Sequence, residues 1–308
     1  MLGLIPVHDD NPTRRPAVVN WALIAVNVVV FFLSPISPLD LSGDANTPAG
    51  ACRQLAFFRE WAAIPVELTE NDPLDETAGP PQGNQCVAVR PGYRKIPALS
   101  VLTAMFLHGG LLHLLGNMLF LFVFGNNVED RLGRIRYLLF YLACGYLATY
   151  GFALSNPASE ETLVGASGAI AGVLGAYLIL YPRARVTSLV PFLFFIPVWL
   201  PAWVVLGSWF VLQWLYFQGA GTAEGAGVAY LAHVVGFAAG SAGLLAGPVV
   251  EEGWRDRLVG TRLVMAACVQ ARAAGLARVA APAAAEPFLA RLGFRPDPAG
   301  GPDLVRGL

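Results

Sequence analysis

Long apolar runs, separated by short polar connections, dominate the hydrophobic pattern of this chain. A helix that spans a membrane needs about 20 mostly apolar residues. Six runs approach that length, at residues 17–33, 99–124, 136–154, 165–181, 192–217 and 227–247. The fourth run is short, and Pro197 and Pro201 interrupt the fifth. The pattern predicts an all-α fold, a polytopic bundle of six transmembrane helices.

Composition favours the same class of protein. Of the 308 residues, 56% are hydrophobic and only 13% are charged, whereas roughly a quarter of the residues in a soluble domain are charged. We therefore expect the lipid bilayer to be a partner of this chain. The net charge of -1 gives no reason to expect a nucleic-acid partner.

The charged residues divide the chain into three parts. We expect a cytoplasmic N-terminus at residues 1–16, a six-helix domain at 17–250 with a long outer loop at 34–96, and a cytoplasmic tail at 251–308. The first residues lack the basic segment, apolar segment and small-residue cleavage site that follow one another in a signal peptide. The first span is therefore expected to remain in the protein.

Arginines set the predicted orientation. They occur in the N-terminus and in the connections after the second and fourth runs, at Arg14, Arg15, Arg131, Arg134, Arg136, Arg183 and Arg185. The connections at 155–164 and 218–226 contain none. Positive-inside counting places both termini in the cytoplasm, and we expect the membrane to be a bacterial inner (cytoplasmic) membrane.

One hydroxyl stands out in the fourth run. Ser167 lies in the sequence LVGASGAIAG, where seven of ten residues are Gly, Ala or Ser. Small residues let two helices pack closely, and they also leave room around a nucleophile. The pattern of this segment alone fits both interpretations.

Other polar residues fall at a comparable depth in neighbouring runs. His113 and Asn117 are four residues apart and share one face of a helix, and His233 lies in the sixth run. Strongly polar residues inside a membrane usually face a cavity or the interior of a bundle. Serine needs a base to accept its proton, and histidine is the commonest base near neutral pH. His108 is expected to line the outer cavity, with its part in the chemistry left open.

Paired glycines suggest how these runs meet. Gly168 and Gly172 form one GxxxG pair, and Gly236 and Gly240 form another. Such pairs allow close approach of two helix backbones, which would bring Ser167 and His233 within hydrogen-bonding distance.

These motifs resemble those of the rhomboid intramembrane serine proteases. GASG at 165–168 is similar to the family's G-x-S-G, HLLGN at 113–117 to its H-x-x-x-N, and AHVVGFAAG at 232–240 to its A-H-x-x-G-x-x-x-G. GNNVEDRLG at 125–133 resembles the family's turn after the second helix. The resemblance covers about residues 15–250.

The resemblance implies a Ser–His dyad that hydrolyses peptide bonds in or near transmembrane segments of other proteins. Ser167 would be the nucleophile and His233 the general base, with no acidic third member. His113, Asn117 and the Ser167 amide would form the oxyanion hole. The small residues expected to pack near the site are Gly165, Gly168, Gly172, Gly236 and Gly240. No cofactor or metal is expected, and the fifth helix would be the substrate gate.

Two functions of other classes stay open at this point. The chain could be a catalytically silent rhomboid-like protein that binds membrane helices, although relatives of that kind typically lack the Ser or the His. It could also be a small transporter or channel, although it has neither an inverted repeat nor intramembrane carboxylates. The absence of H-E-x-x-H argues against a zinc protease of that type.

The outer loop and the tail carry two further expectations. Cys52 and Cys86 flank the polar part of the loop and could form a disulfide if that loop faces an oxidising compartment; the sequence leaves this open. The tail resembles, faintly, the second half of an acetyl-CoA-dependent N-acetyltransferase domain. Its expected phosphate loop at Arg255–Gly260 has Leu258 in place of the first glycine, so we expect no transferase activity.

Overall fold

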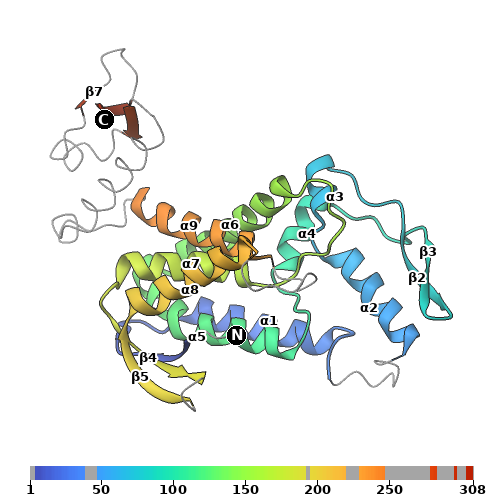
Figure 1. Ribbon diagram of the computed structural model, residues 1–308, viewed down its shortest axis with the longest axis horizontal. Helices are drawn as coiled ribbons and strands as arrows, with labels where there is room; N and C mark the ends of the chain where they lie inside the picture. The colour runs from blue at the N-terminus through green and yellow to red at the C-terminus, as the bar shows by residue number, and fades with distance from the viewer. Residues whose placement is uncertain are drawn as a thin grey trace. The chain divides into compact units, whose positions relative to one another are not determined.

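The computed structural model describes residues 4–38, 47–191, 195–219, 229–246, 278–282, 295–296 and 303–307. The chain divides into two compact units, Met1–Gly243 and Leu244–Leu308. Helices dominate the first unit (Figure 1). They are α1 (Val18–Leu33), α2 (Pro48–Trp61), α3 (Pro65–Glu70), α4 (Pro97–Ala104), α5 (Leu111–Leu132), α6 (Arg134–Ser155), α7 (Ser167–Leu180), α8 (Ala202–Phe217) and α9 (Tyr230–Ala246).

Each of the six predicted runs contains an apolar helix, but the helices differ in length. Among the described residues, α5 and α6 are long and apolar enough to cross a membrane. Four further apolar helices, α1, α7, α8 and α9, are shorter. Many large apolar side chains on these helices are exposed, including Leu112, Ile135, Leu139, Leu154 and Trp203. Surfaces of this kind suit contact with lipid.

The boundaries of two predicted spans were wrong. The run at 99–124 is not one helix, because α4 ends at Ala104 and α5 begins only at Leu111. Gly109 and Gly110, which are poor helix formers, lie in the interruption. The run at 192–217 contains a strand before α8, since prolines at 197 and 201 are incompatible with a helix interior.

The all-α prediction also needs correction, because short strands flank the helices. Strands β1 (Ile5–Asp9), β4 (Arg185–Val190) and β5 (Ile196–Pro201) form an antiparallel sheet in the order β1-β4-β5. Strands β2 (Thr77–Gln82) and β3 (Gln85–Val89) form a hairpin. The sheet and the hairpin lie at opposite ends of the helices (Figure 1).

Helix α7 forms the centre of the first unit. Ten of its fourteen residues are buried, and it packs against α5, α6 and α8. Its glycines also face α9: a Cβ on Gly236 would collide with the carbonyl oxygen of Gly168, and one on Gly240 would collide with that of Gly172. The two backbones are therefore in direct contact, as the paired glycines predicted.

A buried carboxylate fixes the end of α7 that is remote from Ser167. Asp9 on β1 accepts hydrogen bonds from the Tyr177 hydroxyl at 2.6 Å and from the Asn127 side-chain amide at 2.8 Å. Burial raises the pKa of the Asp9 carboxyl above its usual value, and the bond from Tyr177 opposes this shift. The contacts join β1, α5 and α7, so the sheet helps to set the position of α7.

Glu129, in the last turns of α5, caps a different helix. Its carboxylate accepts hydrogen bonds from the backbone amides of Val19 at 3.1 Å and Asn20 at 2.6 Å. These amides lie in the first turn of α1, where backbone donors lack partners within the helix. Glu129 therefore joins α5 to the beginning of α1.

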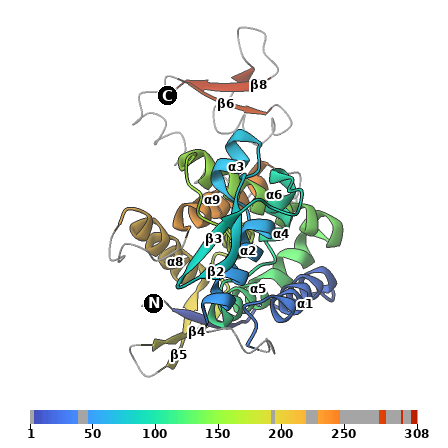
Figure 2. The same cartoon turned by 90° about the vertical axis from the view of Figure 1, so that its right-hand side faces the viewer.

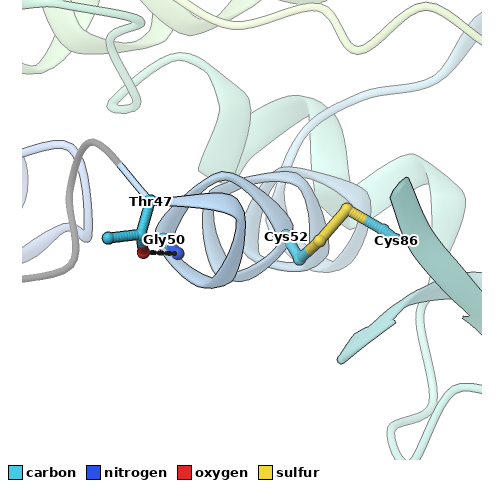
Figure 3. Close-up of a disulfide and its surroundings, with 4 residues drawn as sticks. All are labelled: Thr47, Gly50, Cys52 and Cys86. Atoms are coloured by element: carbon cyan, nitrogen blue, oxygen red, sulfur yellow. Dashed lines mark hydrogen bonds between the residues drawn. A yellow bond between two sulfur atoms is a disulfide. The ribbon is translucent and has the colours of Figure 1, made fainter. Parts of the chain in front are cut away.

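A disulfide joins Cys52 on α2 to Cys86 on β3 (Figure 3). The bond settles the question that the sequence left open. The Thr47 hydroxyl caps α2 by accepting a hydrogen bond from the Gly50 amide, 3.2 Å away. In the second view, the β2–β3 hairpin lies in front of α2 (Figure 2). The described part of the loop at 34–96 is thus folded into helices and a hairpin that a disulfide joins.

The same loop contains a buried ion pair. The Lys95 ammonium lies 2.6 Å from the Glu67 carboxylate, and the two side chains are 4% and 2% exposed. Lys95 also donates a hydrogen bond to the backbone oxygen of Arg59. Burial lowers the pKa of the Lys95 amine, and the contact with Glu67 opposes this effect.

Replacement of both Cys52 and Cys86 by serine is expected to destabilise this loop. The bond links cysteines 34 residues apart and so restricts the unfolded chain. Its loss raises the conformational entropy of the unfolded state and lowers the stability by about 2–4 kcal/mol. Thermal unfolding and limited proteolysis of the purified protein would measure the effect. Reductant should lower the midpoint of thermal unfolding of the wild type and leave that of the double variant unchanged. Equal midpoints for the two proteins without reductant would contradict the prediction.

The second unit contains a small antiparallel sheet. Strands β6 (Arg278–Pro282), β8 (Asp303–Gly307) and β7 (Arg295–Pro296) follow in the order β6-β8-β7. The expected phosphate loop at residues 255–260 lies outside the described residues. The likeness of the tail to an N-acetyltransferase therefore stays a sequence-based expectation.

Candidate active site

Ser167 is the first residue of α7, at the end nearest the outer loop. The segment before it is attached to that loop, since Leu163 and Ala63 exchange backbone hydrogen bonds of 2.7 and 3.2 Å. The Gly165 amide donates to the Ala104 carbonyl at 2.9 Å. Because the first amides of a helix have no acceptor within it, the Ser167 N–H is a free donor with respect to α7.

His233 meets Ser167 from the neighbouring helix. Its Nε2 lies 2.8 Å from the Ser167 Oγ. His233 is on the first turn of α9, one turn before Gly236, which packs on the carbonyl of Gly168. The contact between glycines of α7 and α9 therefore brings the hydroxyl and the imidazole together.

His113 borders the same hydroxyl across Gly165. A Cβ on Gly165 would lie 2.8 Å from the His113 Nε2 and 3.6 Å from the Ser167 Oγ. Gly165 has a φ of +122°, which side chains rarely adopt. It thus lies in the loop before α7, not in a helix contact as the sequence predicted, and leaves space for the His113 ring.

Asn117 is one helical turn after His113 on α5 and is buried. Its amide nitrogen has no hydrogen-bond partner among the described residues. A buried donor without a partner is costly, so the Asn117 amide is well placed to donate a hydrogen bond to a bound ligand. The Gly109 amide donates to the His113 Nδ1 at 3.4 Å, which leaves the proton on Nε2, the atom nearest Ser167.

His108 lies in the interruption between α4 and α5. It is 2% exposed, and its ring packs edge to face against that of His113, with 5.1 Å between centroids. His108 therefore borders the site through His113.

The sequence interpretation missed one residue of the site. The Oε1 atom of Gln213, on α8, lies 2.7 Å from the His233 Nδ1. Ser208 and Gln213 are the strongly polar residues of α8, and a polar side chain inside an apolar helix usually faces a cavity or a bundle interior. The sequence therefore indicated that Gln213 faces the interior, but it did not indicate which residue Gln213 contacts.

No group of three or more His, Cys, Asp or Glu side chains in the described part of the chain is arranged to hold a metal ion. The atoms assembled around Ser167 are a hydroxyl, imidazole nitrogens, amide donors and an amide oxygen. This set can activate a hydroxyl for attack and bind a developing oxyanion.

Comparison with known proteins agrees with the motifs. The Rhomboid domain family matches residues 97–248. YdcA of Bacillus subtilis (strain 168) is 40% identical over 78 residues, which are 25% of this chain and 39% of YdcA. RHOMBOID-like protein 1 of Arabidopsis thaliana is 30% identical over 158 residues, 51% of this chain and 38% of that protein.

A third relative, Rhomboid protease GluP of Bacillus subtilis (strain 168), is 42% identical over 78 residues, 25% of this chain and 15% of GluP. In each of these three comparisons the chain covers less than half of the relative's length. The matched family segment contains all of the residues assembled around Ser167. Residues 97–248 of this chain are a Rhomboid domain, and through that domain the chain is related to the rhomboid proteins.

Proposed function

We propose that this protein is an intramembrane serine endopeptidase that cleaves other membrane proteins in or near their transmembrane segments. The observation that carries the proposal is the 2.8 Å contact between the Ser167 hydroxyl and the His233 imidazole within a Rhomboid domain. Relatives named as rhomboid proteases support the reaction class.

In the proposed first step, the Ser167 Oγ attacks the carbonyl carbon of the scissile peptide bond. The His233 Nε2 accepts the hydroxyl proton and then gives it to the leaving amine. An ester joins Ser167 to the substrate's carbonyl carbon. Water, activated by the same imidazole, hydrolyses that ester and regenerates the hydroxyl.

The tetrahedral intermediates need donors for their negatively charged oxygen. The Ser167 N–H at the beginning of α7, the Asn117 side-chain amide and the His113 Nε2–H are the proposed donors. Removal of one such donor from other serine proteases costs about 10²–10³ in kcat. The free donor of Asn117 and the space at Gly165 support this assignment.

We also propose the membrane arrangement in which the six apolar helices cross the bilayer and both termini are cytoplasmic. The disulfide supports an outer loop on the oxidising side, because disulfides are rare in the cytosol. Arg14 and Arg15, before α1, support a cytoplasmic N-terminus. A bacterial inner membrane would accommodate this orientation.

A fluorophosphonate probe tests the activated serine directly. We expect the probe to label the purified protein in detergent and mass spectrometry to place the label on Ser167, because an alkoxide-like nucleophile is phosphonylated and an ordinary hydroxyl is not. Heat-unfolded protein is the control and should not react. Labelling of other serines only, or none, would instead support the catalytically silent, helix-binding alternative.

A further inference from the structure

We propose that Gln213 is a positioning residue that holds His233 in the tautomer and orientation its role as a base requires. The proposal rests on the protease function above. It keeps the expectation of a dyad with no acidic third member and adds a neutral amide, on α8, as a third member.

The two contacts of His233 lie on opposite sides of its ring. Nε2 is 2.8 Å from the Ser167 hydroxyl and Nδ1 is 2.7 Å from the Gln213 Oε1. A neutral imidazole carries one N–H, and an amide oxygen can only accept. The bond to Gln213 therefore places the proton on Nδ1 and leaves Nε2 as the acceptor that Ser167 needs.

The opposite tautomer would be inactive as a base. With the proton on Nε2, the ring could not accept the hydroxyl proton of Ser167. In serine proteases with an aspartate in this position, loss of the correct tautomer lowers kcat by about 10⁴. An uncharged amide stabilises the imidazolium less than a carboxylate does, so we expect a smaller loss here.

Within the described residues, the three helices packed around His233 bring no charged side chain to its ring. Helices α7, α8 and α9, which supply its neighbours, have no Asp, Glu, Lys or Arg within their bounds. On α5, the titratable group that borders the site is His113, whose Nε2 lies beside Gly165. The amide dipole of Gln213 is thus the partner available to the Nδ1–H when the ring becomes charged.

Helix α8 holds the ring by a second contact. Trp209, one turn before Gln213, lies 6.0 Å from the His233 ring between centroids. The buried residues of α8 are Ala202, Val205 and Leu206, all in its first two turns. Gln213 lies in the less buried half of α8. The orientation of the His233 ring therefore depends on the position of this half of the helix relative to α9.

Kinetics of Gln213→Leu and Gln213→Glu variants test the assignment. We expect Gln213→Leu to lower kcat about 10- to 100-fold and to leave KM nearly unchanged, because its apolar side chain of similar size cannot accept the Nδ1–H. Gln213→Glu should retain much of the wild-type kcat, because a carboxylate accepts the same bond. Gln218→Leu, on the exposed end of the same helix, is the matched control.

The pH profile separates positioning from a merely structural role. A carboxylate at position 213 stabilises the imidazolium and raises the pKa of His233. Because the neutral ring is the active base, activity is lost as the pH falls through that pKa. The acid limb of kcat/KM should therefore move to higher pH in Gln213→Glu, and a structural contact would not move it.

Nitrogen NMR of ¹⁵N-histidine-labelled protein gives a readout that does not need activity. We expect the Nδ1–H tautomer at His233 in the wild type and a mixture of tautomers in Gln213→Leu. If the wild type cleaves substrate while Gln213→Leu matches it in kcat, pH profile and nitrogen shifts, the positioning role is overturned and the protease function stands. If Gln213→Leu changes the tautomer but the wild type neither cleaves nor reacts with the probe, the positioning holds and the protease function fails.

Discussion

Replacement of Ser167 by alanine is expected to lower the turnover of a transmembrane substrate by a factor of about 10⁴–10⁶. The substitution removes the oxygen that forms the covalent intermediate, and it leaves the N–H at the beginning of α7 in place. A fluorogenic transmembrane peptide in liposomes that contain the purified protein would measure the loss. The change is small and exposes no new surface, so stability should be nearly unaffected.

Two comparisons make this result specific. Ser155→Ala, which removes an exposed hydroxyl bonded to the Gly151 carbonyl, should retain wild-type turnover. His233→Ala should be about as damaging as Ser167→Ala, and the double variant no worse than either one, because groups that act as a unit are not additive. Turnover by Ser167→Ala at the wild-type rate would exclude Ser167 as the nucleophile.

Replacement of Gly236 by alanine is expected to lower turnover at least about 100-fold, since a displacement near 1 Å of catalytic groups can have this effect. The new Cβ would collide with the carbonyl oxygen of Gly168, which is backbone and cannot rotate away. Helices α7 and α9 must separate, and the Ser167–His233 contact of 2.8 Å must lengthen. Overpacking of this kind also costs about 1–3 kcal/mol of stability.

Gly207→Ala is the matched control, because a Cβ at this helical position of α8 meets no atom within 4 Å in the described part of the chain. It should retain turnover and gain up to about 1 kcal/mol from the better helix propensity of alanine. Turnover would be measured in the same liposome assay and stability by thermal unfolding. Equal behaviour of Gly236→Ala and Gly207→Ala would show that close contact of the two helices does not control the site.

The outer loop shows how a feature remote from the chemistry can affect it. Leu163 pairs with Ala63 of that loop only four residues before Ser167, and the loop is stabilised by the Cys52–Cys86 disulfide. The sequence indicated the cysteines but not the strand pairing, because backbone hydrogen bonds between segments 100 residues apart leave no local pattern. The same reason explains why the pairing of β1 with β4 was missed.

Gln213 illustrates a different limit of the sequence. A single amide in an apolar helix signals that the side chain faces the protein interior, yet it does not name the group it contacts. Its partner His233 lies 20 positions away on another helix. The rotation of α8 about its axis decides which residue of that helix meets the ring, and packing against other helices sets this rotation.

Local pattern alone determined which segments contain the apolar helices and which small and polar residues they carry, because the hydrophobic pattern and the glycine spacing are properties of residues close together in the sequence. It also determined the relationship to rhomboid proteins, through motifs shorter than ten residues. The tertiary structure decided the pairing of β1 with β4, the disulfide and the contact of His233 with Gln213. Each of these depends on which distant segments pack together, and their packing minimises the free energy of the whole chain instead of that of any single segment.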